Sequence, residues 1–148
     1  MWNMIIKKAE PQDLQSIVDI AKELHLDIPN FVWDQPEFIQ KQIERGECFF
    51  LEDGGEPVGV IALRERKNGI HIESLVVKKS HTAKGYGTKL IEFAKEFAKD
   101  RGHKSLHAYT FREYNILDFY LKRGFTLQEY SGSYNGRPYY CLEMKVGK

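Results

Sequence analysis

The sequence lacks what several classes of protein require. Its two cysteines, Cys48 and Cys141, lie far apart in apolar runs, which excludes a disulfide framework or a zinc pattern and predicts buried core thiols. No run approaches the ~20 apolar residues of a membrane-spanning helix. The first ten residues also lack the arrangement of a signal peptide. We therefore expect a cytoplasmic protein that does not contact a membrane.

The chain also lacks an excess of charge of either sign. Lys and Arg number 22 against 21 Asp and Glu, a net charge of +1, so no sustained field attracts a polyanion and nucleic acid is not an expected partner. Apolar residues make up 42% of the 148, which is typical of a folded globular protein. At this length we expect one domain that spans residues 1–148.

Hydrophobic periodicity predicts an α/β fold. Helical spacing occurs in four segments, and alternating or continuous apolar runs bounded by turn residues occur in seven. We predict helices over 12–24, 36–45, 85–101 and 113–123, and strands over 3–9, 48–52, 57–66, 70–77, 104–110, 125–133 and 137–146. The order is βααβββαβαββ, a mixed central sheet with helices on both faces. A helix joins strands 70–77 and 104–110, so these two should be parallel neighbours.

A glycine-containing turn precedes the third helix. It comprises Thr82, Ala83, Lys84, Gly85, Tyr86, Gly87 and Thr88. Backbone N–H groups at a helix N-terminus bind phosphate, and glycine lets a ligand approach closely, although a Gly-x-Gly turn is also an ordinary loop. The spacing fits neither a Walker loop nor a dinucleotide fingerprint.

This turn resembles the acyl-CoA signature of the GNAT N-acetyltransferase family, Gln/Arg-x-x-Gly-x-Gly/Ala. A second segment, 115–125, resembles the family's other signature, with Asn115, then Phe119-Tyr120, then Gly124-Phe125. Taken singly, Phe119 and Tyr120 would be helix core and Gly124 a helix cap. Together, and in order, the two segments extend the resemblance over nearly the whole chain and imply the GNAT fold and an acyltransferase that uses acetyl-CoA.

The resemblance also implies where acetyl-CoA binds. The turn from Thr82 to Thr88 would hold the diphosphate, and a bulge at Leu75, Val76 and Val77 would let strand backbone pair with the pantetheine arm. Thr82 stands where the family has Gln or Arg, and Ala83 where Gly is frequent. The turn's N–H groups survive both changes and Lys84 adds a charge-assisted contact, so we expect binding to be kept.

Attack on a thioester needs a base for the amine, a donor for the developing oxyanion and an acid for the thiolate. Strand alternation places His71 and Glu73 on one side of a strand. By resemblance, Glu73 acting through water is the favoured base, with His71 as the second choice, and the amide near Leu75 faces the thioester carbonyl. Tyr120 would be the acid, and Asn115 would bind pantetheine or order water. A His-x-Glu pair without a third ligand predicts no metal.

Several alternatives stay open. The chain can transfer acetyl from acetyl-CoA to a primary amine by direct attack in a ternary complex, or it can be a non-catalytic acyl-CoA-binding sensor or scaffold. A longer acyl donor fits equally well. The acceptor depends on segments 25–35 and 130–140, which leave a small amine, an amino-acid derivative and a peptide or protein amine all open. Formation of a homodimer is equally open.

Overall fold

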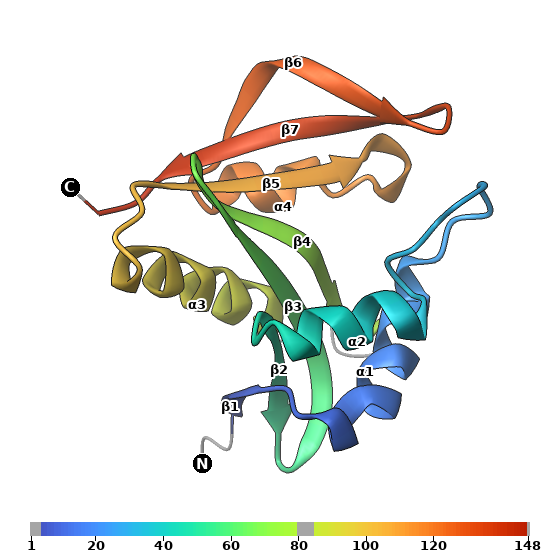
Figure 1. Cartoon of the computed structure of the whole chain (residues 1–148). Helices are drawn as coiled ribbons and strands as arrows, with labels where there is room; N and C mark the ends of the chain where they lie inside the picture. Colours follow the sequence, from blue (N-terminus) through green and yellow to red (C-terminus); the bar gives the residue numbers. More distant parts are fainter. Residues whose placement is uncertain (1–3, 80–84, 148) are drawn as a thin grey trace. The chain divides into compact units, whose positions relative to one another are not determined.

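The computed structural model describes residues 4–79 and 85–147, which form a mixed α/β fold (Figure 1). The strands are β1 (Met4–Lys8), β2 (Cys48–Asp53), β3 (Glu56–Arg66), β4 (Gly69–Val77), β5 (Ser105–Phe111), β6 (Thr126–Tyr134) and β7 (Arg137–Lys145). The helices are η1 (Pro11–Asp13), α1 (Leu14–Ala21), η2 (Lys22–Leu24), α2 (Pro36–Glu44), α3 (Tyr86–Asp100), η4 (Arg112–Tyr114) and α4 (Leu117–Lys122). The strands form one sheet in the hydrogen-bonded order β1-β2-β3-β4-β5-β7-β6. The predicted fold class is confirmed.

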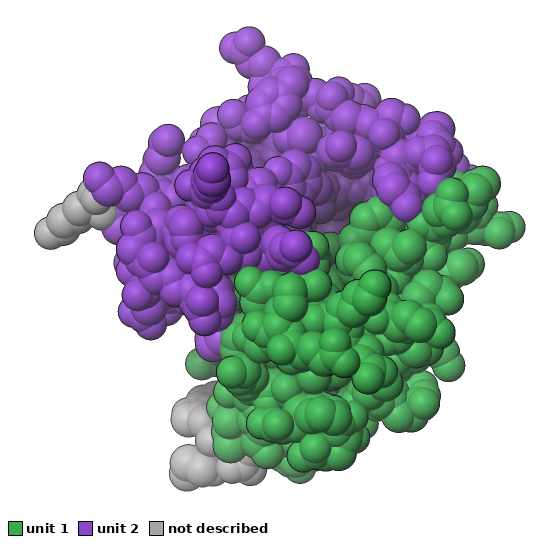
Figure 2. Space-filling model, in the orientation of Figure 1, with its two compact units in different colours: residues 1–63, 73–90 green, residues 64–72, 91–148 purple. Residues whose placement is uncertain are grey.

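The chain divides into two compact units (Figure 2). Residues 1–63 and 73–90 make up unit 1, and residues 64–72 and 91–148 make up unit 2. Both units therefore take part of β3, β4 and α3.

Unit 1 has a core between its first two helices and the sheet. Helices α1 and α2 are amphipathic, and their buried residues follow the helical period. They pack on inward-facing strand residues in one cluster: Ala9, Ile17, Val18, Ile20, Ala21, Ile39, Ile43, Cys48, Phe50, Val60 and Val76. The predicted helix over 12–24 is observed as η1, α1 and η2 in succession.

The opposite face of β3 in unit 1 meets the start of α3. Gly59 precedes Val60, so its missing side chain would point away from the α1 and α2 cluster. A Cβ at Gly59 would lie 3.1 Å from Leu90 Cδ1 and 3.3 Å from the carbonyl oxygen of Val76. Glycine here lets α3 approach the sheet closely, and helices cover both faces of the sheet in this unit.

Unit 2 joins the N-terminal part of β4 to β5, β7 and β6. Ile70 pairs with Leu106 in parallel, which confirms the predicted parallel neighbours, and β5 pairs with β7 in the antiparallel sense. Strands β6 and β7 form a hairpin around Asn135 and Gly136, whose φ angles of 48° and 87° are those of a type I′ turn.

The predicted helix over 113–123 is wrong as one element. Asn115 adopts the left-handed conformation, with φ at 57°, and its N–H donates to the carbonyl oxygen of Arg112 at 3.0 Å. Asparagine tolerates this conformation better than other residues with a Cβ, and it separates η4 from α4. Apolar periodicity alone could not distinguish this break from a continuous helix.

Both cysteines are buried, as predicted. Burial and the nearby Asp13 carboxylate raise the pKa of Cys48 to about 12, and burial also raises the pKa of Cys141. Neither thiol is in the reactive thiolate form at neutral pH.

Candidate functional site

The N-terminus of α3 is positioned by a glycine and a buried tyrosine. Gly85 has φ at +79°, a conformation that favours glycine, and its carbonyl oxygen accepts the N–H of Lys89 at 3.1 Å. Tyr86, 2% exposed, donates its hydroxyl to the carboxylate of Asp53 at the end of β2. This hydrogen bond, followed by desolvation, raises the pKa of the phenol to about 12. The first turn of α3 is therefore anchored to the β2–β3 hairpin.

This turn has the features of an anion site. The first N–H groups of an α-helix have no acceptor within the helix, and the helix dipole favours negative charge there. Among the described residues, a Cβ built on Gly85 would meet nothing within 4 Å, so the turn is open on that side. Gly87 and Thr88 lie in the same first turn. The predicted ligands Thr82, Ala83 and Lys84 lie outside the described residues.

Glu73 and Val76 of β4 lie three residues apart, and both contact groups on the α2 side of the sheet. Glu73 bonds to residues of α2, and Val76 packs in the cluster that α1 and α2 cover. Residues three apart in a regular strand point to opposite faces, so a β-bulge that adds one residue between them accounts for both contacts. The bulge expected at 75–77 would have this effect, and it stays a prediction. The side chain of Val76 is buried in the core, so a ligand at residues 75–77 would bind to the backbone.

Glu73 is held by two donors, one from α2 and one from the residue that caps its C-terminus. Its Oε1 accepts the Gln42 Nε2–H at 2.9 Å and the Arg45 Nη2–H at 3.3 Å. Gln42 is 2% exposed, and the Glu73 side chain is 17% exposed. Arg45 also donates from Nε to Glu47 Oε1 at 2.9 Å. The Glu73 side chain is therefore partly exposed, and its carboxylate is fixed by two donors.

His71 belongs to a different network, in unit 2. The oxygen of the Asn68 side chain accepts from His71 Nε2 at 2.7 Å, so Nδ1 is the acceptor for the hydroxyl of Tyr109 at 2.9 Å. The ring stacks on His107 with centroids 4.5 Å apart. Burial, followed by the charges of His107 and Arg66, lowers the pKa of His71 to about 4. At neutral pH the ring is neutral and both of its nitrogens are engaged.

Tyr120 lies in the middle of α4, and Asn115 lies two residues before the helix begins. Tyr120 is 3% exposed, with its ring edge-on to Phe125 at a centroid separation of 5.3 Å. Burial raises the pKa of its phenol, so the hydroxyl keeps its proton at neutral pH. Asn115 is exposed, and its left-handed backbone presents the amide away from the helical path. These assignments stay predictions.

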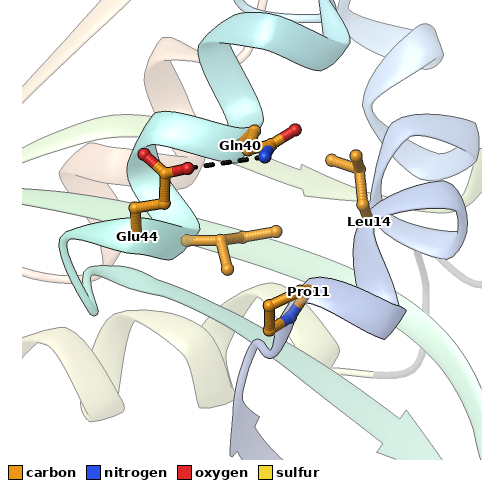
Figure 3. Close-up of a pocket in the computed structure, with 5 residues that line it drawn as sticks. Pro11, Leu14, Gln40 and Glu44 are labelled. Carbon is orange, nitrogen blue, oxygen red and sulfur yellow. Dashed lines mark hydrogen bonds between the residues drawn. The ribbon is translucent and has the colours of Figure 1, made fainter.

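A pocket of unit 1 is formed by residues of η1, α1 and α2 (Figure 3). It is lined by Pro11, Leu14, Gln40, Ile43 and Glu44, and Gln40 Nε2 donates to Glu44 Oε2 across its rim at 3.4 Å. None of the predicted site residues lines it. We therefore do not place acyl-CoA in this pocket.

Within residues 4–79 and 85–147, no group of three or more His, Cys, Asp or Glu side chains is arranged to hold a metal ion. No described helix is long and apolar enough to cross a membrane.

Sequence reasoning missed Gln42, Arg45 and Tyr109. Their partners lie 28 to 38 residues away in the chain, so no local sequence pattern predicts these contacts. Gln42 carried one weak signal, since it is a polar residue beside Ile43 on a short amphipathic helix. A buried amide in such a place needs a partner.

Comparison with known proteins decides the family. The sequence model of the acetyltransferase (GNAT) family matches residues 14–125, which include β4, the described start of α3 and the whole of α4. The chain belongs to the acetyltransferase (GNAT) family. This confirms the resemblance carried by the glycine turn and the Asn115–Phe125 segment.

Two curated GNAT relatives are bacterial. The chain is 33% identical over 94 residues to the uncharacterized N-acetyltransferase YvbK of Bacillus subtilis, a match that covers 62% of this chain and 61% of that protein. It is 27% identical over 149 residues to an uncharacterized N-acetyltransferase of Lactobacillus delbrueckii subsp. lactis, covering 85% and 86% respectively. The chain thus aligns with less than two thirds of the Bacillus protein.

A solved structure shares the GNAT fold. The PaiA N-acetyltransferase of Thermoplasma acidophilum, crystallised in complex with coenzyme A, superposes with a TM-score of 0.81 at 20% identity, covering 97% of this chain and 99% of that one. At this identity the likeness shows the fold alone.

Proposed function

We propose that the protein transfers an acetyl group from acetyl-CoA to a primary amine by direct attack within a ternary complex. The observation that carries the proposal is the family match over residues 14–125, which includes the described start of α3, with its open, anchored N-terminal turn. The complex of PaiA with coenzyme A supports the same donor.

The residues present fit such a co-substrate. The first turn of α3 offers N–H groups to the diphosphate, and Gly85 removes the side chain that would crowd it. Thr82, Ala83 and Lys84 complete the turn in this proposal. The backbone of Leu75, Val76 and Val77 pairs with the pantetheine arm, and Asn115 donates or accepts a further hydrogen bond. Acetyl-CoA supplies the activated acyl group as a thioester.

Glu73 is the base in this proposal, acting directly or through one water. It accepts the proton that the amine loses as its nitrogen bonds to the acyl carbon. The N–H of Leu75 donates to the carbonyl oxygen, where negative charge develops. Tyr120 gives its proton to the thiolate when the carbon–sulfur bond breaks, and takes one back from solvent. The products are an N-acetylated amine and free coenzyme A.

The structure favours Glu73 over His71 as the base. His71 has its Nδ1 occupied by the Tyr109 hydroxyl and its Nε2 by Asn68, and its pKa is lowered to about 4. A ring so engaged is a poor proton acceptor. His71 instead orients Tyr109, whose exposed ring lies on the same network.

Two measurements test the proposal on folded protein. Calorimetry with coenzyme A and acetyl-CoA should show binding, and a thiol-release assay over a panel of small amines, amino-acid derivatives and peptides should show release with at least one acceptor. Binding without release to any acceptor would favour a non-catalytic acyl-CoA sensor. Absence of binding to either compound would refute both functions. Acyl-CoAs of increasing chain length, assayed with the same acceptor, define the donor.

A further inference from the structure

Both hydrogen bonds to the Glu73 carboxylate fall on the same oxygen. Gln42 Nε2 donates to Oε1 at 2.9 Å, and Arg45 Nη2 donates to Oε1 at 3.3 Å. An oxygen of a carboxylate has two lone pairs, so two donors occupy it fully. Among the described residues, no hydrogen bond to Oε2 is recorded. The carboxylate is therefore asymmetric, with one oxygen satisfied by the protein and the other open.

The two donors are themselves fixed. Gln42 lies 2% exposed on α2, where an amide without a partner would be costly, so its bond to Glu73 is built into the packing of the helix. Arg45, one turn further along, is held from its other side by Glu47, whose side chain is 11% exposed. Glu47 directs the guanidinium, and the guanidinium and amide together direct Glu73.

The contact between Arg45 and Glu73 differs from the usual geometry of an arginine–carboxylate ion pair. An arginine that only neutralises a carboxylate commonly contacts both oxygens in a two-pronged pair. Arg137 contacts both oxygens of Glu113 from a single nitrogen, at 2.6 Å from Oε1 and 2.7 Å from Oε2. Arg45 instead divides its nitrogens between Glu47 and a single oxygen of Glu73. Arg45 thereby links Glu47 to one oxygen of Glu73 and makes no contact with the other oxygen.

We propose that Gln42 and Arg45 are positioning residues that present Oε2 of Glu73 as the proton-accepting atom. The proposal rests on the role of Glu73 in the proposed function. The proton of the attacking amine passes to Oε2 as the nitrogen–carbon bond forms and the carbon–sulfur bond breaks. It then leaves to solvent, while Oε1 keeps both hydrogen bonds throughout. Loss of either donor lets the carboxylate rotate away from the amine.

The test compares single and double variants with the best acceptor from the amine panel. Gln42→Met and Arg45→Met should each lower kcat about tenfold and leave the KM for acetyl-CoA within about twofold, because they misorient the base without touching the donor site. In a Glu73→Gln background, the same two substitutions should lower kcat no further, because they act through Glu73. Arg45→Lys, which keeps the charge, should recover part of the loss.

The matched control is Gln40→Met, the same substitution on an exposed position of the same helix. It should leave kcat unchanged. If Gln42→Met does not fold, as judged by circular dichroism, Arg45→Met and Arg45→Lys carry the test.

The outcomes separate this inference from the function on which it rests. If Gln42→Met or Arg45→Met lowers kcat further in the Glu73→Gln background, the positioning role is overturned and acetyl transfer is not. An equal loss of kcat in Gln40→Met has the same consequence. A Glu73→Gln enzyme with unchanged kcat would remove the base and its positioning residues together. Absence of transfer by the wild-type protein to every acceptor would overturn the proposed function, and this inference with it.

Discussion

The hydroxyl of Tyr86 donates a hydrogen bond to the carboxylate of Asp53, and this bond ties the first residue of α3 to the end of β2. Tyr86 occupies the variable position between the two glycines of the family signature, where no particular side chain is prescribed. The residue is nevertheless buried. Its contact holds the first residue of α3 against the β2–β3 hairpin.

Tyr86→Phe should weaken acetyl-CoA binding. Without the hydroxyl, the Asp53 carboxylate loses its donor and the helix start gains freedom, so we expect the KM for acetyl-CoA to rise about three- to tenfold with little change in kcat. Asp53→Ala, which removes the acceptor, should have a similar effect. Steady-state kinetics with a saturating acceptor gives both constants.

Tyr130→Phe is the control for this prediction, because Tyr130 is 60% exposed and the substitution is chemically identical. It should leave the KM for acetyl-CoA unchanged. An equal rise in both variants would show that the Tyr86 hydroxyl has no special role.

Asn115 allows its backbone and side chain to be tested separately. Asn115→Gly keeps the left-handed backbone, so the free energy of unfolding should stay within about 0.5 kcal/mol while acetyl-CoA binding weakens through loss of the amide. Asn115→Ala should lower the free energy of unfolding by about 1 kcal/mol as well. Urea denaturation and calorimetry with acetyl-CoA check the two parts, and tight binding by Asn115→Gly would contradict the ligand role.

The sequence predicts those features of the fold and the site that depend on residues close together in the chain. The β6–β7 hairpin follows from Asn135 and Gly136, because the turn chemistry lies in the turn itself. The bulge expected in β4 rests on the apolar run at 75–77 and on the family resemblance, and it stays a prediction. The contacts of Gln42 and Arg45 with Glu73 required the packing of α2 on the sheet. These are tertiary contacts. Hydrophobic periodicity predicts which face of a helix is buried, but it does not predict which distant residue packs against that face.

Tyr120→Phe should separate chemistry from binding. If the phenol protonates the leaving thiolate, its removal lowers kcat about 100-fold, whereas the ring still fills its site against Phe125 and the KM for acetyl-CoA changes little. The raised pKa of the phenol keeps it protonated at neutral pH, as an acid must be. An unchanged kcat would remove Tyr120 from the mechanism.

The lowered pKa of His71 predicts a pH dependence of stability. The folded value is about 4 and the unfolded value about 6.5, so the unfolded chain binds more protons between these limits. The contribution of His71 is therefore fully present above pH 6.5 and is lost as the pH falls toward 4. Because the ring is partly exposed, we expect this contribution to the free energy of unfolding to be about 1 kcal/mol. Urea denaturation of wild type and His71→Asn from pH 4.5 to 7.5 should show the difference narrowing at low pH, and a constant difference would contradict the assignment.

Gly132 makes room for the ring of Tyr139. A Cβ at this position would lie 2.3 Å from the tip of that ring, which must then move. Gly132→Ala should therefore shift Tyr139 relative to Tyr109 and Phe111, its edge-on neighbours, at a cost of about 1 kcal/mol or less. Near-ultraviolet circular dichroism and the KM for the acceptor should both change if this hairpin contacts the acceptor. An altered spectrum with an unchanged KM would exclude Tyr139 from acceptor binding.

The two buried thiols have a chemical consequence for a protein proposed to hold a thioester. Thioesters exchange readily with thiolates, so a reactive cysteine near the donor would capture the acyl group and leave the protein covalently modified. Cys48 and Cys141 are shielded from solvent, and both are kept as neutral thiols. Burial thereby protects both cysteines from self-acylation by the thioester that the proposed function brings to the protein.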